Sequence, residues 1–235
     1  MQNIKIGAVA AVLSSLALAT SAATVTAGSL SRSVGEDVIV DSVNQRQWLG
    51  ADVTKGLTYT QTLAELATGG RFAGYQIARS ADALMFIGAL WNDASSCNSD
   101  GTNYISCYGD NNGEDMSSVF GDSYSANSPG GYNYDYMWFL TDRVAWDGSA
   151  LAGIAYSHDY GTNGYYSNNY KEAYAGDWSS LQDTQYYTQG DNAIGWLLYR
   201  EGNAVPEPGT LALAGLAVAG LVVTRRRRAA APTAD

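Results

Sequence analysis

The chain has 235 residues, of which 26 are glycine, 17 are tyrosine and six are tryptophan, and its formal net charge is −10. This acidity repels the phosphate backbone of nucleic acids and argues against them as partners. A zinc site needs three or four His or Cys ligands, and this chain has one histidine and two cysteines that are expected to be oxidised, so zinc is close to excluded. The chain also lacks the Gly-Lys-Ser/Thr loop that cradles phosphates.

Residues 1–23 have the layout of a secretory signal peptide. Lys5 supplies the basic start, residues 6–19 are apolar, and small residues fill positions 20–23. This order predicts export and removal of the segment by signal peptidase. We expect cleavage after Ala23, although Ala22 and Ala27 also satisfy the small-residue rule.

Residues 24–204 are predicted to form one extracellular domain, which is long enough for a hydrophobic core of its own. Loss of both chain ends removes five of the 13 basic and two of the 23 acidic residues, so the mature chain has a net charge of about −13. The expected fold is α+β, with two short N-terminal helices followed by an antiparallel remainder rich in strands and loops.

The first predicted helix covers residues 61–68. Thr58 and Gln61 have the spacing of a capping box, in which each side chain bonds the backbone of the other residue. Gly69 and Gly70 are expected to end the helix, because glycine adopts the left-handed turn most easily. The predicted core face of this helix holds Leu63, Leu66 and Ala67.

Two strands and a second helix are predicted around this first helix. The β-branched run at residues 37–41 and the alternating run at residues 72–78 indicate strands. Ser80 is the expected cap of a helix that continues through Leu90. This helix is expected to present Leu84, Ile87 and Trp91 to the core.

Cys97 and Cys107 are the two cysteines of the chain. An even, closely spaced pair in an exported protein is typical of a disulfide. The bond would close the polar loop 98–106 and stabilise the fold by about 2 to 3 kcal/mol on loop-entropy grounds. Two free thiols or a metal-binding pair are the alternatives.

The acidic segment 110–115 is the one candidate calcium site. Asp110, Asn112 and Glu114 alternate as hard oxygen ligands, but the glycine at place six and the glutamate at place twelve of an EF-hand loop are absent. The alternative is a solvated turn, and no other cofactor is expected.

The second half of the domain is rich in Gly, Ser, Asn and Tyr, which is typical of short strands joined by loops. Residues 136–140 and 151–156 are apolar enough to be central strands. Turn dipeptides stand beside them at Asp147-Gly148 and Asn163-Gly164. Residues 194–200 form one further apolar run near the end of the domain.

Catalytic chemistry has two candidate starting points. His158 lies between Ser157 and Asp159, but sequence neighbours on a strand point to opposite faces, so we expect a structural histidine rather than a triad. Asp142 and Asp147 could hydrolyse glycosides if they were held at a suitable separation. We therefore expect a protein that is not an enzyme, with a secreted hydrolase of this carboxylate type as the alternative.

The C-terminal tail has three parts in a fixed order. The motif is Val205-Pro206-Glu207-Pro208, the apolar run is 211–223, and the basic stop is Arg225-Arg226-Arg227-Arg228, followed by a disordered end at 229–235. The apolar run is shorter than the roughly 20 residues of a permanent membrane span. The arginines are expected to stay on the cytoplasmic side. A plain C-terminal membrane anchor is the alternative reading.

This tail, residues 205–228, resembles the PEP-CTERM sorting signal. The resemblance implies export in a Gram-negative bacterium that makes extracellular polysaccharide. It also implies an inner-membrane intermediate, cleavage at the Pro-Glu-Pro by an exosortase, and a final place at the cell surface or outside the cell.

A second resemblance concerns the domain itself. Three short motifs are similar to the opening of domains that often precede this tail: Trp48-Leu49, Thr54-x-Gly56-x-Thr58-Tyr59 and residues 74–78. The same motifs are similar to C-type-lectin-like and formylglycine-generating-enzyme-like domains. Those domains close with a strand like residues 194–200, which pairs back near the start of the fold. The chain departs from the usual pattern at Gln76, Arg79 and Asp82.

The expected function is that of a non-catalytic cell-surface or matrix protein associated with polysaccharide. Tyrosine rings stack on sugar rings, while their hydroxyls and nearby Asn and Asp bond the sugar hydroxyls. Packing of half-buried strands is the alternative role for each ring. The tyrosines proposed for binding are Tyr132, Tyr134, Tyr136, Tyr165, Tyr166, Tyr186 and Tyr187.

Overall fold

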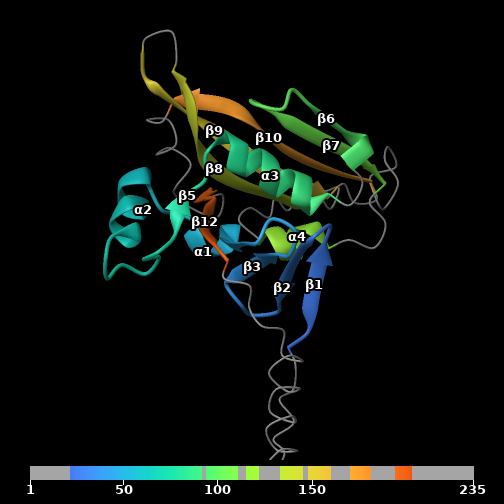
Figure 1. Ribbon diagram of the computed structural model, residues 1–235, viewed down its shortest axis with the longest axis horizontal. Helices are drawn as coiled ribbons and strands as arrows, with labels where there is room; N and C mark the ends of the chain where they lie inside the picture. Colours follow the sequence, from blue (N-terminus) through green and yellow to red (C-terminus); the bar gives the residue numbers. More distant parts are fainter. Residues whose placement is uncertain are drawn as a thin grey trace, which may run out of the picture.

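The structure, a computed structural model, describes residues 22–91, 94–110, 115–121, 133–144, 148–159, 170–180 and 194–202. In these ranges the chain forms two six-stranded sheets with short helices between and beside them (Figure 1). The mostly β architecture with a few helices agrees with the broad expectation of an antiparallel, strand-rich domain.

The first sheet has the strand order β1-β2-β3-β4-β12-β5, with every neighbouring pair antiparallel. Its first four strands follow one another along the chain as a meander. Their bounds and those of the two remaining strands are Thr24–Ala27 (β1), Leu30–Ser33 (β2), Val38–Asp41 (β3), Arg46–Leu49 (β4), Gln76–Ile77 (β5) and Leu198–Glu201 (β12). The strand predicted at residues 37–41 is thus confirmed as β3.

The second sheet has the order β11-β8-β9-β10-β7-β6, and only the β11–β8 pair is parallel. Both runs predicted to be central strands lie in its middle, within the long β8 and β9. The bounds are Cys97–Ser99 (β6), Ile105–Asp110 (β7), Asn133–Val144 (β8), Ala150–Asp159 (β9), Tyr170–Ser180 (β10) and Gly195–Trp196 (β11).

Five short helical segments accompany the sheets in the described residues. They are α1 (Ala51–Thr54), α2 (Tyr59–Leu66), α3 (Ser80–Leu90), the 3₁₀ turn η1 (Ala94–Ser96) and α4 (Met116–Phe120). Figure 1 shows α3 lying along the second sheet, with α4 and the strands β1 to β3 on its other side. The helices α3 and α4 therefore fill the layer between the two sheets.

The main core joins the two sheets through these helices. Trp48 of β4 and Phe86 of α3 are fully buried, with ring centroids 4.9 Å apart. Phe86 also meets the buried Phe120 of α4 at 5.5 Å. Edge contacts of this kind add to the free energy gained by burying the rings. At the rim, the turn between β1 and β2 docks on the end of α3, where a side chain at Gly28 would overlap the Ala89 carbonyl.

The predicted capping box is confirmed, but the predicted helix face is wrong. Gln61 N donates to Thr58 Oγ1 at 3.2 Å, and Thr58 N donates to Gln61 Oε1 at 2.8 Å. The helix begins directly after this cap, at Tyr59, and its buried residue is Thr62, whereas Leu63 is 45 % exposed. Thr62 can be buried because its hydroxyl donates to the Thr58 carbonyl at 2.9 Å.

The second predicted helix has the expected bounds but a different cap. Arg79, not Ser80, is the N-cap residue, and its backbone N–H donates to the Asp82 carboxylate at 2.9 Å. The strand predicted over residues 72–78 is reduced to β5, because a turn with Gly74 at φ +89° occupies its first half.

The predicted strand at residues 194–200 belongs to both sheets rather than to one. Its first half is β11, parallel to β8, and its second half is β12, antiparallel to β4. Leu197 lies between them, donating its N–H to Trp138 and accepting from Ala78 N, each at 2.8 Å. The chain thus crosses from the second sheet to the first at Leu197. The expected pairing of this run with the start of the fold is present, with Tyr199 opposite Trp48.

Residues 1–21 of the predicted signal peptide (1–23), the predicted tail (205–228) and the end at 229–235 lie outside the described residues. Among the helices that the structure describes, none has the length and apolarity needed to cross a membrane.

Candidate functional site

A group of aromatic and charged side chains lies on one face of the second sheet, and we call it the tyrosine–histidine cluster. Strand pairing builds it in two rows. Tyr136 of β8 is opposite Tyr156 of β9, which is opposite Tyr174 of β10. In the next row on the same face, His158 of β9 is opposite Glu172 of β10. Residues two apart on a strand share a face, so the five side chains form one patch.

The rings of the cluster contact one another closely. Tyr156 stacks on His158 with centroids 4.2 Å apart and on Tyr174 with centroids 5.0 Å apart. Tyr136 meets Tyr156 edge-on at 5.8 Å and His158 edge-on at 5.7 Å. Directly opposed side chains in a sheet are near enough for such contacts, which hold the rings in fixed orientations.

The polar ends of these side chains are bonded within the cluster. Tyr156 donates its hydroxyl proton to Glu172 Oε1 at 2.8 Å. The Tyr136 hydroxyl and His158 Nε2 lie 3.1 Å apart, and His158 Nδ1 lies 3.7 Å from Glu172 Oε2. The His158 side chain is 13 % exposed and that of Glu172 is 23 % exposed. The cluster is therefore a half-buried, preformed surface.

One further tyrosine extends this face. Tyr108 of β7 is opposite Glu172 on the neighbouring strand and is 54 % exposed. It is the most exposed tyrosine that the described ranges contain on this face. The aromatic surface therefore continues beyond β10 onto β7.

The sequence pointed to only part of this surface. Tyr136 is in the cluster, and the backbone of Tyr134 is opposite His158. The other tyrosines proposed for binding, at 132, 165, 166, 186 and 187, lie outside the described residues. Sequence reasoning missed Tyr174 and Glu172, although the alternation of these residues with Ala173 and Ala175 was a signal for one polar and one buried face.

The arrangement around His158 differs from that of a catalytic triad. Ser157 is 1 % exposed on the opposite face of β9, as the strand alternation predicted. His158 instead faces a carboxylate from another strand, Glu172. Of the carboxylate pair considered for hydrolysis, Asp142 forms a close ion pair with Arg79, and Asp147 lies outside the described residues.

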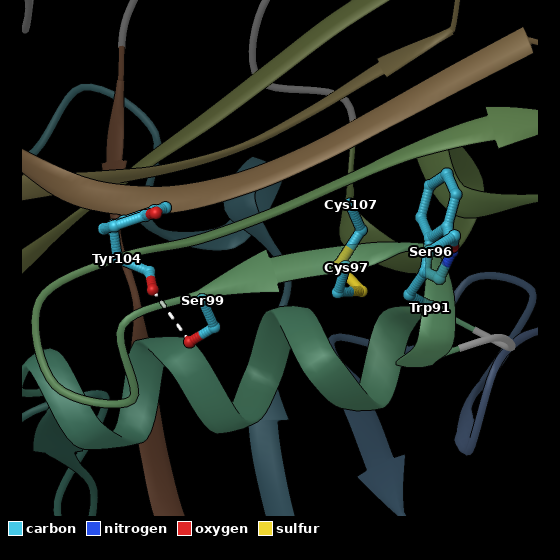
Figure 2. Close-up of a disulfide and its surroundings, with 6 residues drawn as sticks. All are labelled: Trp91, Ser96, Cys97, Ser99, Tyr104 and Cys107. Atoms are coloured by element: carbon cyan, nitrogen blue, oxygen red, sulfur yellow. Dashed lines mark hydrogen bonds between the residues drawn. A yellow bond between two sulfur atoms is a disulfide. The ribbon is translucent and has the colours of Figure 1, made fainter.

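Cys97 and Cys107 form a disulfide between β6 and β7, where they are directly opposite in the strand register with Cα atoms 4.0 Å apart. Figure 2 shows the bond above α3, with Trp91 and Ser96 at one end of the hairpin and Ser99 and Tyr104 towards the other. Ser99 Oγ donates to the Tyr104 carbonyl at 2.9 Å. The bond and this contact hold the edge of the second sheet together.

The hairpin turn is organised by Asp100. Its Oδ1 accepts the backbone N–H groups of Thr102, Asn103 and Tyr104 at 2.9, 2.7 and 3.1 Å. These donors, that of Asn103 above all, favour the ionised form and hold the pKa of Asp100 well below its usual range. The turn is thus built on a carboxylate that stays charged.

The candidate calcium ligands are not brought together within the described part of the chain. Asp110 is the last residue of β7, and Asn112 and Glu114 lie outside the described residues. Where the structure does describe the chain, no group of three or more His, Cys, Asp or Glu side chains could hold a metal ion. The calcium site remains a prediction.

Comparison with protein families identifies one segment of the chain. Residues 204–228 match the model of the PEP-CTERM protein-sorting motif. This match includes the Pro-Glu-Pro, the apolar run and the four arginines. The motif marks an exported, cell-surface-directed protein whose sorting depends on an exosortase, a membrane protein.

No curated protein and no solved structure matches the chain. The resemblance of the domain to C-type-lectin-like and formylglycine-generating-enzyme-like domains therefore has no support from these comparisons.

Proposed function

We propose that this exported protein binds an extracellular polysaccharide at the tyrosine–histidine cluster and does not cleave it. The protein would leave a Gram-negative cell by way of signal peptidase and an inner-membrane intermediate. After cleavage by the exosortase it would act at the cell surface or in the matrix around the cell.

The observation that carries the proposal is the row of tyrosines across three adjacent strands. Tyr136, Tyr156 and Tyr174 hold their rings in fixed orientations at spacings of 5.8 and 5.0 Å. Aromatic rings offer apolar faces to sugar rings, and their hydroxyls can exchange hydrogen bonds with sugar hydroxyls. A surface that is already ordered also loses little conformational entropy when it binds.

The same geometry favours binding over hydrolysis. Glycosidases need two carboxyl groups about 5 to 9.5 Å apart across the scissile bond. Among the residues that the structure describes, the cluster contains one carboxylate, Glu172, whose oxygens contact the Tyr156 hydroxyl at 2.8 Å and His158 Nδ1 at 3.7 Å. The mature charge of about −13 further favours a neutral or weakly charged polymer, unless calcium bridges protein and polymer.

The test is a pull-down of the mature protein with exopolysaccharide from the native host, with and without added calcium. Tyr108→Ala removes the most exposed ring of the face, and Tyr156→Ala removes the ring at the centre of the cluster. Each should weaken retention about tenfold or more, which corresponds to about 1.4 kcal/mol. Val43→Ala, at an exposed position between β3 and β4 of the first sheet, is the control and should retain the polymer.

Thermal unfolding of each variant separates loss of binding from loss of fold. Because Tyr108 is exposed, its removal should leave the melting temperature nearly unchanged. Absence of retention in both calcium conditions ends the binding proposal. Shortened polymer chains after incubation would instead favour the secreted hydrolase.

A further inference from the structure

A hollow of about 500 Å³ opens beside the first sheet, and none of its lining residues belongs to the tyrosine–histidine cluster. Its lining comes from β2, from the loop after β2, from α1 and from α4. Small-molecule sites have volumes of roughly 300 to 1,000 Å³, so the hollow is large enough for one. Its most buried charged residue is Arg32 of β2, which is 8 % exposed.

Arg32 is held in one orientation by its neighbours. Its Nε donates to the Glu36 carbonyl at 2.7 Å, and its Nη2 donates to Asp52 Oδ2 at 2.9 Å. Its Nη1 approaches two glycines so closely that a Cβ at Gly50 or Gly121 would lie 2.6 or 2.8 Å away. Both positions need glycine to leave room for the guanidinium.

The third nitrogen of this guanidinium lacks a protein partner. Within the ranges that the structure describes, Nη1 donates to no protein acceptor, although Arg32 is more than nine-tenths buried. An arginine offers five N–H donors, and Nη1 is not one of the fully buried atoms that lack a partner, so its protons are accessible to a ligand in the hollow. Arg32 lines the hollow and has N–H donors without a protein acceptor among the described residues. It can therefore bind a ligand that supplies a hydrogen-bond acceptor.

The rest of the lining supplies mainly acceptors. Four acidic residues line the hollow: Glu36, Asp37, Asp52 and Asp115. Glu36 and Asp37 are exposed, and among the described residues their carboxylates accept no hydrogen bond, so both can accept one from a ligand. The hydroxyl of Ser118 lies on the same wall.

These features narrow the class of ligand. Four carboxylates against one guanidinium repel an anion, and a wall with these five charged residues does not suit a lipid. In the described part of the chain these carboxylates do not gather into a group that could hold a metal ion. A hydroxyl group both donates and accepts, so a polyhydroxylated neutral molecule can satisfy Arg32 and the separate carboxylates together.

We infer that the Arg32 hollow binds a single unit or chain end of a neutral sugar. This inference rests on the proposed function, because it takes the ligand to be a saccharide. It assigns that ligand a separate site, beside the first sheet. A polymer could then contact the tyrosine–histidine cluster along its length while the hollow receives an end or a branch.

The test measures binding of glucose, galactose, mannose and N-acetylglucosamine to the mature, disulfide-bonded protein by ligand-observed NMR. Ser118 is exposed on α4, so Ser118→Trp should fill the hollow and weaken binding at least about tenfold. Thr60→Trp, at an exposed position of α2, adds the same ring elsewhere and should bind like the parent. Glu36→Gln with Asp37→Asn, both exposed, is a second variant that should weaken binding without depending on a bulky side chain.

Charge gives a further criterion, because salt screens the attraction of a cation but has little effect on a neutral ligand. Neutral sugars should bind equally well at low and high salt. Failure of all four sugars to bind the parent protein would overturn the inference. Undiminished sugar binding by Ser118→Trp would overturn it as well. If only glucosamine binds and salt abolishes that binding, the hollow is a site for amines and the inference is wrong.

The two proposals fail in different ways. In one outcome, the polymer is retained by the parent and by Ser118→Trp but not by Tyr108→Ala, and no small sugar binds. This outcome supports polymer binding at the tyrosine–histidine cluster and overturns sugar binding in the hollow. In the other outcome, the parent binds small sugars, Ser118→Trp does not, and the polymer is not retained. This outcome supports sugar binding in the hollow and overturns the tyrosine–histidine cluster as the polymer site.

Discussion

Ser157 and His158 are adjacent in the chain but lie on opposite faces of β9, and their surroundings differ accordingly. His158 contacts rings and a carboxylate within the tyrosine–histidine cluster. Ser157 is 1 % exposed, and its hydroxyl has no hydrogen-bond partner among the residues that the structure describes. Burying a hydroxyl without a partner costs free energy that the fold must offset elsewhere.

This contrast predicts the effect of removing the hydroxyl. Ser157→Ala should change the free energy of unfolding by less than about 1 kcal/mol, toward greater stability, because the lost group had no partner. Thr54 is the control, since its buried Oγ1 donates to the Trp196 carbonyl and accepts from the Trp196 N–H, both at 2.9 Å. Thr54→Ala should cost about 1 to 3 kcal/mol.

Urea denaturation of both variants measures the two effects. A loss of more than about 1 kcal/mol in Ser157→Ala would contradict this prediction, because it would mean that the hydroxyl makes a stabilising hydrogen bond.

The sequence could predict which face each of these residues occupies but not what it meets there. Strand alternation placed Ser157 and His158 on opposite sides. The partner of His158, Glu172, depends on the register between β9 and β10, and no local pattern sets that register. The room for the Arg32 guanidinium likewise depends on Gly121, which is 89 positions along the chain.

Among the structural elements, the β6–β7 hairpin depends most on covalent support. It lies at the edge of the second sheet, and β6 has only three residues. Cys97 is partly buried and Cys107 is fully buried. Such a short edge strand buries little apolar surface, so a crosslink that limits the unfolded chain has a large relative effect.

The expected result is that both cysteines resist labelling in the unfolded, unreduced protein. Cys97→Ala with Cys107→Ala should lower the free energy of unfolding by about 2 to 3 kcal/mol. Reductant should destabilise the parent protein by a similar amount and leave the double variant unchanged. Stoichiometric labelling of both thiols without reductant would contradict the pairing.

Sequence patterns located elements well where local chemistry decides them. The reciprocal bonds of Thr58 and Gln61 started α2 as predicted, and the apolar runs around Tyr136 and Tyr156 became the central strands. The run 194–200 was identified as a strand, but its division at Leu197 was not. That division depends on two distant partners, Trp138 and Ala78, and therefore on how the sheets are stacked.

At the scale of the whole molecule, the first sheet contains both ends of the folded domain. β1 begins at Thr24 and β12 ends at Glu201, so all the elements in the described ranges lie between the predicted signal peptide and the sorting motif at residues 204–228. Because Glu201 is exposed at the end of a paired strand, the motif follows the folded domain almost directly.

This organisation predicts that the mature protein lacks everything after the Pro-Glu-Pro region. The apolar run 211–223 is short for a permanent span, and its alanine and glycine content makes it weakly hydrophobic. The segment therefore suits brief retention before cleavage. Mass spectrometry of the surface protein should find peptides up to the motif and none from residues 229–235.

Changes in the motif should block this step without affecting the fold. Pro206→Ala with Glu207→Ala disrupts the Pro-Glu-Pro element, whose prolines make it rigid and disfavour a helix. The uncut chain should then stay in the inner membrane. Glu201→Ala removes an acidic side chain just before the motif and should be processed normally, because its only described ion pair, with Arg46 at 3.6 Å, is largely exposed on the Glu201 side. Peptides from 229–235 in the surface form of the parent, or normal processing of the motif variant, would show that the tail anchors the protein permanently or is cut elsewhere.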